Sequence, residues 1–256
     1  MLVTSAEIAS WVGGLLWPLA RIGALVSVAP VYGSRTLPVR ARLLLALALT
    51  WAVWPLLEAA PTVEPLSPAG FLILAQQVLI GFAVGFLLRL AFAALEISGQ
   101  IVATQMGLSF ASLVDPQAGG QMPLLGQFFQ LTGTLIFLSL NGHLLLIQLL
   151  AESFVALPVG GAGLAPANLW NLARAAGWMF AGALAIALPA LVSLLVVNLA
   201  FSVISRAAPQ LNLFAVGFPV TLILGLLILL YSLPALLPQF SRLLDGAFGG
   251  ARGLLF

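Results

Sequence analysis

The stretch Ala175–Ser205 reads AAGWMFAGALAIALPALVSLLVVNLAFSVIS and contains no charged side chain. As an α-helix it would be roughly 46 Å long at about 1.5 Å per residue. The hydrocarbon core of a bilayer is only about 30 Å thick. The stretch therefore predicts a membrane helix that is too long for a simple perpendicular crossing. Either it is tilted or kinked, with Pro189 near its middle, or other proteins cover part of its apolar surface.

The same kind of uncharged run recurs along the rest of the chain. Backbone groups in lipid must be paired internally, which favours helices. The runs are continuous and do not alternate as strands of a barrel do. We therefore expect an all-α, membrane-associated protein built from helical hairpins. Pro and Gly breaks divide the runs into about six long, kinked segments, 7–29, 39–58, 69–105, 124–157, 168–205 and 210–240.

The composition excludes several classes of function. The chain has 256 residues, of which 62% are hydrophobic and 6% charged, whereas soluble domains carry roughly 25% charged residues. A soluble globular enzyme is therefore excluded. Without Cys and with a single His, the chain offers no thiolate or His-rich metal site, so we expect no metal and no cofactor. A net charge of +2 gives no basic footprint for nucleic acid.

The distribution of charge along the chain predicts its orientation. Arg35, Arg40 and Arg42 lie between the first two segments, and Glu58 and Glu64 lie in the next loop. The positive-inside rule places the first loop in the cytoplasm and both termini outside, although two arginines near the C-terminus, Arg242 and Arg252, oppose this assignment. The N-terminal stretch lacks a positive n-region, so we expect no cleavable signal peptide.

One stretch between two apolar segments does not fit a regular helix. Gln105–Pro123 reads QMGLSFASLVDPQAGGQMP, and its Asp-Pro and Gly-Gly pairs discourage a continuous helix. It is nevertheless too apolar for a solvated loop, and such a segment is tolerated at membrane depth only where protein buries it or it lines a cavity. Flexible Met side chains suit a constriction that closes a pore by dewetting. A buried connector and a gate both remain open on this reasoning.

Arg89 and Glu96 interrupt an apolar segment. Seven residues separate them, close to two helical turns, so they share a face. Ionisable groups in such segments usually face a bundle interior or water. A structural pair in a protein-covered interface is favoured over a proton or ion relay, because a relay needs further ionisable neighbours.

Asn141-Gly142-His143 interrupts another long uncharged run. One interpretation is a proton site, or a hydrolytic dyad of His143 with Ser139 or Ser109. The favoured interpretation is a local helix break in which Asn141 and His143 bond to freed backbone groups.

Two further features concern how helices join and pack. Pro209 disfavours helix at the preceding residue, so Arg206–Asn212 predicts a tight hairpin tip between the last two segments. The tip is either a plain turn or a docking point for a cytoplasmic partner. Gly81 and Gly85 have the spacing that permits close helix–helix approach.

These strings together resemble the FliR/SctT family of type III secretion export-gate proteins. The resemblance covers nearly the whole chain in order. It is carried by WPLARIGALVSVAPVYGSRTLPVRARL (Trp17–Leu43), QQVLIGFAVGF (Gln76–Phe86), QMGLSFASLVDP (Gln105–Pro116), NGHLLLIQLL (Asn141–Leu150), LP (Leu188–Pro189), NLA (Asn198–Ala200) and SRAAPQLNLFAVGFPVTLILG (Ser205–Gly225).

The resemblance implies a non-enzymatic channel subunit for unfolded secreted proteins, in the flagellar basal body of the bacterial inner membrane. It implies a hetero-oligomeric helical cone with FliP-like and FliQ-like subunits, surrounded by membrane lipid, and contact with FlhB-like and FlhA-like components. Residues 1–165 resemble a FliP-like part and residues 166–256 a FliQ-like hairpin. The flagellar form is favoured over the virulence form, and a small secondary transporter is the other alternative.

The resemblance also assigns residues. The plug would be formed within 105–123 by Met106, Gly107, Leu108, Ser109, Phe110, Asp115, Pro116, Gly119, Gly120 and Met122. Structural polar residues within membrane segments would be Arg89, Glu96, Asn141, His143 and Asn198, and the cytoplasmic hairpin tip would present Arg206, Pro209, Gln210 and Asn212. No catalytic residue and no metal ligand are expected.

Overall fold

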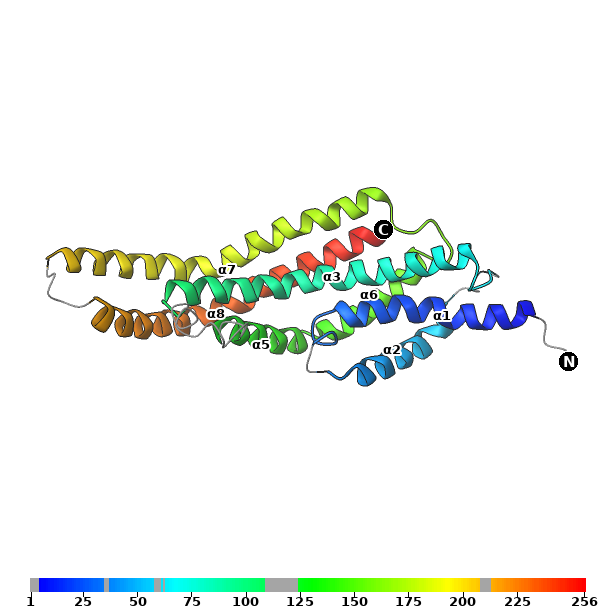
Figure 1. The fold of residues 1–256 in the computed structure, drawn as a ribbon, viewed down its shortest axis with the longest axis horizontal. Coiled ribbons are helices and arrows are strands. Elements are labelled where there is room, and N and C mark those ends of the chain that lie inside the picture. The colour runs from blue at the N-terminus through cyan, green and yellow to red at the C-terminus, as the bar shows by residue number, and fades with distance from the viewer. Residues whose placement is uncertain (1–4, 35–36, 58–60, 62, 109–123, 208–212) are drawn as a thin grey trace. The chain divides into compact units, whose positions relative to one another are not determined.

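The computed structural model describes residues 5–34, 37–57, 61, 63–108, 124–207 and 213–256 (Figure 1). Every regular element within these ranges is helical, which confirms the predicted all-α class. The elements are α1 (Ser5–Val28), α2 (Val39–Val53), the short 3-10 helix η1 (Trp54–Leu56), α3 (Pro68–Gln105), α5 (Leu124–Ser139), α6 (Gly142–Ala156), α7 (Pro166–Ala207) and α8 (Leu213–Leu255).

Three helices in the described residues are long and apolar enough to cross a membrane. They are α3, α7 and the Gly217–Leu255 part of α8. The pair α5 and α6 makes a fourth candidate if the two are counted as one broken span. Pro189 lies inside α7 and does not end it, so the overlong apolar segment predicted here is a single helix of 42 residues.

The predicted segment 124–157 is divided in the structure. α5 and α6 meet at an angle of 68°, because Asn141 adopts a left-handed conformation with φ of 55°. Asn tolerates this conformation better than most residues. The Asn141 carbonyl then accepts hydrogen bonds from the amides of Leu144 and Leu145 at 2.9 and 3.1 Å. The break predicted at Asn141 is confirmed, and the prediction of one continuous segment over 124–157 is wrong.

The predicted end of the last segment at residue 240 is also wrong, since α8 continues to Leu255. Pro, Gly and charged residues near this point favour an end by local propensity. Ala247, Ala251 and Leu254 are buried, however, and their spacing places them on one helical face. Burial of this face stabilises helix where local propensity does not.

The described residues pack as two compact units. The first comprises Met1–Leu90, Phe137–Ala176 and Asp245–Phe256. Within it α1 packs beside α2 (Figure 1) and also against α3. A Cβ at Gly81 would overlap the carbonyl oxygen of Arg21, and one at Gly85 would lie 3.1 Å from the carbonyl oxygen of Leu25. The predicted close approach at these two glycines is therefore confirmed, with α1 as the partner helix.

The second unit comprises Ala91–Ile136 and Gly177–Leu244. Here α3 approaches α5 closely, because a Cβ at Gly99 would lie 2.6 Å from the carbonyl oxygen of Leu125. Phe92 of α3 contacts Phe240 of α8 edge to face, with ring centroids 5.3 Å apart. Small residues and aromatic contacts thus join the described helices of this unit.

Candidate functional site

The C-terminal end of α3 forms the base of the predicted plug stretch. The amide of Leu108 donates to the carbonyl of Ala103, and the amide of Gly107 donates to that of Thr104, both at 3.0 Å. With Gly107 at φ of 82°, these two bonds are those of a Schellman motif. Because a side chain strains this left-handed conformation, Gly107 fixes where α3 ends.

Residues from α7 and α8 hold this helix end in place within the second unit. The Nδ2 of Asn198 on α7 donates a 3.4 Å hydrogen bond to the carbonyl of Gln105. This carbonyl does not accept either of the two bonds of the Schellman motif. The Met106 side chain is buried against Gly225 of α8, where a Cβ would lie 2.6 Å from the Met106 Cγ. The predicted plug stretch therefore begins at an end of α3 that residues of α7 and α8 anchor.

Most of the predicted plug lies outside the described residues, which resume at Leu124. This applies to Ser109, Phe110, Asp115, Pro116, Gly119, Gly120 and Met122. It also applies to Pro209, Gln210 and Asn212 of the hairpin tip. Arg206 is described, and it is exposed in the last turn of α7, where a cation complements the helix dipole.

The predicted pair on α3 has one exposed and one partly buried member. Arg89 is exposed, and Glu96 is partly buried beside Gly126 of α5, where a Cβ would lie 3.7 Å from the Glu96 Cγ. The exposed position of Arg89 leaves it accessible to groups outside this chain. A structural role for the two residues stays a prediction.

Two polar side chains, those of Asn141 and His143, lie at the helix break. Asn141 makes no capping hydrogen bond with its side chain. The Nδ1 of His143 is buried and lacks a hydrogen-bond partner among the described residues. The left-handed backbone of Asn141 marks the break, and a structural role for the side chains of Asn141 and His143 stays a prediction.

The most completely buried cation of the described residues is one that the sequence patterns did not single out. Arg21 of α1 is 0% exposed. Its Nε donates to the Oε1 of Gln77 on α3 at 2.8 Å. Its Nη1 donates to the carbonyl of Ser153 on α6 at 2.6 Å, and its Nη2 to the carbonyl of Leu157 at 2.7 Å. The guanidinium also lies 4.2 Å from the ring centroid of Phe154.

Arg21 thus joins three helices of the first unit through neutral acceptors. Leu157 directly follows α6, so the cation lies at the negative end of the dipole of this helix. The sequence signal was a charged residue inside the apolar segment 7–29, which by itself marks an intramembrane ionisable group. Its partners are 56 to 136 residues away in sequence, so sequence spacing could not identify them.

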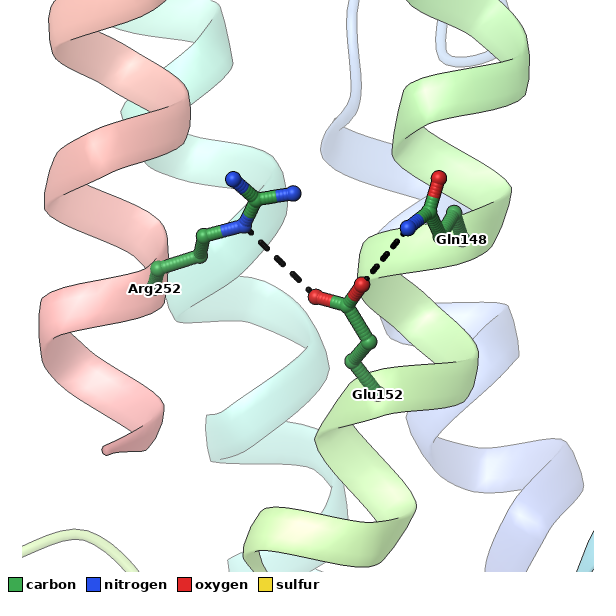
Figure 2. A network of polar contacts seen from close by, with 3 residues as sticks. All are labelled: Gln148, Glu152 and Arg252. Atoms are coloured by element: carbon green, nitrogen blue, oxygen red, sulfur yellow. Dashed lines mark hydrogen bonds and ion pairs between the residues drawn. The ribbon is translucent and has the colours of Figure 1, made fainter.

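A second polar network ties the end of α8 to α6 in the same unit (Figure 2). The Nε of Arg252 lies 3.6 Å from the Oε2 of Glu152, and the Nε2 of Gln148 donates to the other carboxylate oxygen at 2.8 Å. Near the start of α7, which begins at Pro166, the Nδ2 of Asn168 donates a separate hydrogen bond to the carbonyl of Leu254 near the end of α8.

Comparison with known proteins shows the family of the chain. The family described as "Bacterial export proteins, family 1" matches residues 12–247. The Flagellar biosynthetic protein FliR of Escherichia coli (strain K12) is 40% identical over 246 residues, which is 96% of this chain and 94% of the relative. The proteins of the same name from Pectobacterium carotovorum subsp. carotovorum and Aquifex aeolicus (strain VF5) are also 40% identical, covering 93% and 89% of this chain and 90% and 88% of the relatives.

The long apolar helices and the family match together define a membrane-associated export protein. The chain belongs to the bacterial export proteins, family 1. Within this family it groups with the FliR proteins, and it is a subunit of the flagellar type III export gate. The resemblance stated from the sequence is thereby confirmed.

Proposed function

We propose that this subunit lines the export channel and carries the plug that closes it. The observation that carries the proposal is the uncovered apolar surface of α7 and α8. In their most apolar stretches 22% of the residues of α7 and 17% of those of the Gly217–Leu255 part of α8 are buried, against 67% in α3. At about 1.5 Å per residue, a helix of 42 residues extends far beyond the hydrocarbon core. Other proteins must cover what lipid cannot reach.

The proposed partners are FliP-like and FliQ-like subunits in one helical cone, with this chain contributing a FliP-like part (1–165) and a FliQ-like hairpin (166–256). The hairpin tip around Arg206 meets an FlhB-like component, and an FlhA-like component belongs to the same apparatus. The assembly lies in the flagellar basal body at the bacterial inner membrane. Its substrates are unfolded flagellar proteins.

In this proposal the plug is the stretch Gln105–Pro123. Met106 and Gly107 belong to its anchored base, as their contacts with Gly225 and Thr104 indicate. Leu108, Phe110 and Met122 supply the soft apolar seal beyond it. Gly119 and Gly120 allow the outer part of the stretch to move aside when a substrate passes.

The subunit acts as a channel component and not as an enzyme. Its sequence contains no nucleotide-binding loop, so energy for export comes from partner proteins or from the proton gradient. Its own contribution is shape, an apolar constriction and surfaces for assembly.

Co-expression with the FliP-like and FliQ-like subunits of the same bacterium tests the assembly. We expect native mass spectrometry of the detergent extract to show a discrete hetero-oligomer that contains one copy of this chain. A stable particle that contains this chain alone and binds a small solute would contradict the proposal and favour a secondary transporter.

Replacement of 109–122 by a short Gly-Ser linker tests the plug. This change leaves Gln105–Leu108 and their contacts intact, so the complex should still assemble. We expect ion leakage through reconstituted complexes to rise at least tenfold. The control is Gly23→Ala on α1, where nothing lies within 4 Å of an added Cβ. Unchanged leakage in an assembled complex would refute the plug assignment.

A further inference from the structure

A cleft lies between α3 and α7 in the second unit, directly before the residues that end α3. Its volume is about 310 Å³. Six described residues line it, five from α3 and one from α7, namely Ile97, Gln100, Ile101, Thr104, Gln105 and Leu191. The five from α3 follow one another at intervals that keep them on a single side of the helix. The cleft is therefore a groove along the last turns of α3, with α7 as its other wall.

The cleft combines hydrogen-bonding groups with branched apolar side chains. Gln100 and Thr104 are exposed, and Gln105 beside them is partly buried. The remaining lining residues, two Ile and one Leu, contribute only hydrocarbon. A ligand of this cleft therefore needs polar groups that can pair with amides and a hydroxyl, together with apolar groups that pack between them.

The side chains of the two glutamines are directed to something other than the described residues. The side-chain hydrogen bonds that other described residues make to them end on their backbone carbonyls. The hydroxyl of Thr104 donates to the carbonyl of Gln100 at 2.9 Å, and the Nδ2 of Asn198 donates to that of Gln105 at 3.4 Å. A glutamine side chain has two N–H donors and a carbonyl acceptor. Against lipid hydrocarbon these groups would lack partners, which disfavours lipid as the occupant.

An extended polypeptide has the complementary chemistry. Each of its residues carries one N–H donor and one C=O acceptor that the extended chain does not pair internally. A glutamine amide can pair with both, whereas a helix of another subunit has already paired its backbone groups. From Ile97 to Gln105 the groove is about 12 Å long at about 1.5 Å per residue. This length corresponds to about four residues of an extended chain at about 3.3 Å each.

We infer that this cleft binds a short extended segment of the unfolded protein in transit through its peptide groups. The inference rests on the proposed function and adds to it a surface that contacts the substrate. Since the cleft ends at Gln105, where the plug stretch begins, the bound segment lies next to the plug. Recognition of peptide groups does not depend on the side chains of the substrate, so the cleft accepts export proteins of unrelated sequence.

Photochemical cross-linking in the assembled complex tests the inference. Gln100 is replaced by the photoreactive p-benzoylphenylalanine, and an export substrate fused to a stably folded domain is stalled in the channel. We expect illumination to join the probe to the extended part of the substrate, as identified by mass spectrometry. The control probe replaces Leu135 on α5, which is 69% exposed in the same unit but lies outside the cleft. It should not react with the substrate.

A third probe, in place of Leu108 at the base of the plug, separates two kinds of failure. If Leu108 reacts with the stalled substrate and Gln100 reacts only with lipid or another subunit, the cleft is not a substrate site and the inference is overturned. If none of the three probes reacts with the substrate in an assembled complex, the proposed function fails, because the subunit then does not line the channel.

The role of the glutamine amide has its own test. With the probe in place of Thr104, we expect Gln100→Leu to lower the yield of substrate cross-links about fivefold, the effect of about one hydrogen bond. The loss should be the same for two substrates of unrelated sequence. The control is Thr132→Val on α5, which loses only a 2.9 Å bond to the Phe128 carbonyl of its own helix. An unchanged yield in Gln100→Leu, or a loss confined to one substrate, overturns recognition through peptide groups.

Discussion

The guanidinium of Arg21 on α1 donates a 2.6 Å hydrogen bond from its Nη1 to the carbonyl oxygen of Ser153 on α6. The same group reaches Gln77 on α3 and Leu157 after α6. A planar fork of donors can satisfy several acceptors at once, which a Lys ammonium cannot do in the same geometry. Arg21 therefore fixes the mutual arrangement of three helices at a site without a carboxylate among its hydrogen-bond partners.

We expect Arg21→Lys to destabilise the protein by about 1.5–3 kcal/mol, the size of a lost hydrogen bond to a charged group. Thermal unfolding of the purified complex in detergent measures the change. Arg174→Lys is the control, since Arg174 is exposed and lies 5.4 Å from the ring of Trp170. An equal effect of the two substitutions would contradict the role given to Arg21.

Substitutions at Gly81 and Gly23 provide a second test with a matched control. A Cβ at Gly81 would overlap the carbonyl oxygen of Arg21, whereas nothing lies within 4 Å of one at Gly23. We expect Gly81→Ala to cost about 1–3 kcal/mol through overpacking. Gly23→Ala should be neutral or stabilising by up to about 1 kcal/mol, because Ala favours helix over Gly. Unfolding midpoints of both variants in one detergent decide the matter, and a stable Gly81→Ala variant would refute the close helix contact.

Gly107 should resist substitution for a different reason, its left-handed backbone. We expect Gly107→Ala to cost about 1–2 kcal/mol, and Gly107→Asn to cost less because Asn is the other residue found at this position of helix ends. Hydrogen exchange at the amides of Gly107 and Leu108 reports on the cap. Equal exchange in both variants and the unmodified protein would show that the cap does not depend on glycine.

Replacement of Asn198 by Ala is expected to have a small effect on the stability of the protein and a larger one on closure of the channel. Its single hydrogen bond to Gln105 is long, at 3.4 Å, so Asn198→Ala should cost about 0.5–1 kcal/mol. If this bond positions the base of the plug, ion leakage of the reconstituted complex should rise. Ser193→Ala, which removes only a bond to the Pro189 carbonyl four residues earlier in the same helix, should leave leakage unchanged.

The ion pair of Arg252 and Glu152 should contribute little. The Arg252 side chain is 54% exposed and the pair is 3.6 Å apart, and exposed pairs are worth about 0–1 kcal/mol. We expect Glu152→Gln to shift the unfolding midpoint by no more than a few degrees, and less at high salt. A large shift at any salt concentration would mean that the network of Figure 2 is buried in the assembly.

Much of the architecture was predictable from the chain itself. Uncharged runs such as Ala175–Ser205 predict long apolar helices, because exclusion of charge from apolar surroundings depends on composition alone. The Gly81 and Gly85 spacing predicted a close helix contact. The ordered strings of the sequence were sufficient to recognise the export family, which the comparisons confirm.

Where helices end and what they touch required the tertiary structure. The sequence by itself determined that the chain is helical, apolar and poor in charge, and it marked Gln105 and Gly107 as lying at a break. Only the tertiary structure decided that α8 continues to Leu255 and that Arg21 meets Gln77 and Leu157. Local patterns act within a few turns of a helix. Burial and hydrogen bonding join residues that are distant in sequence, so their outcome depends on how the whole chain packs.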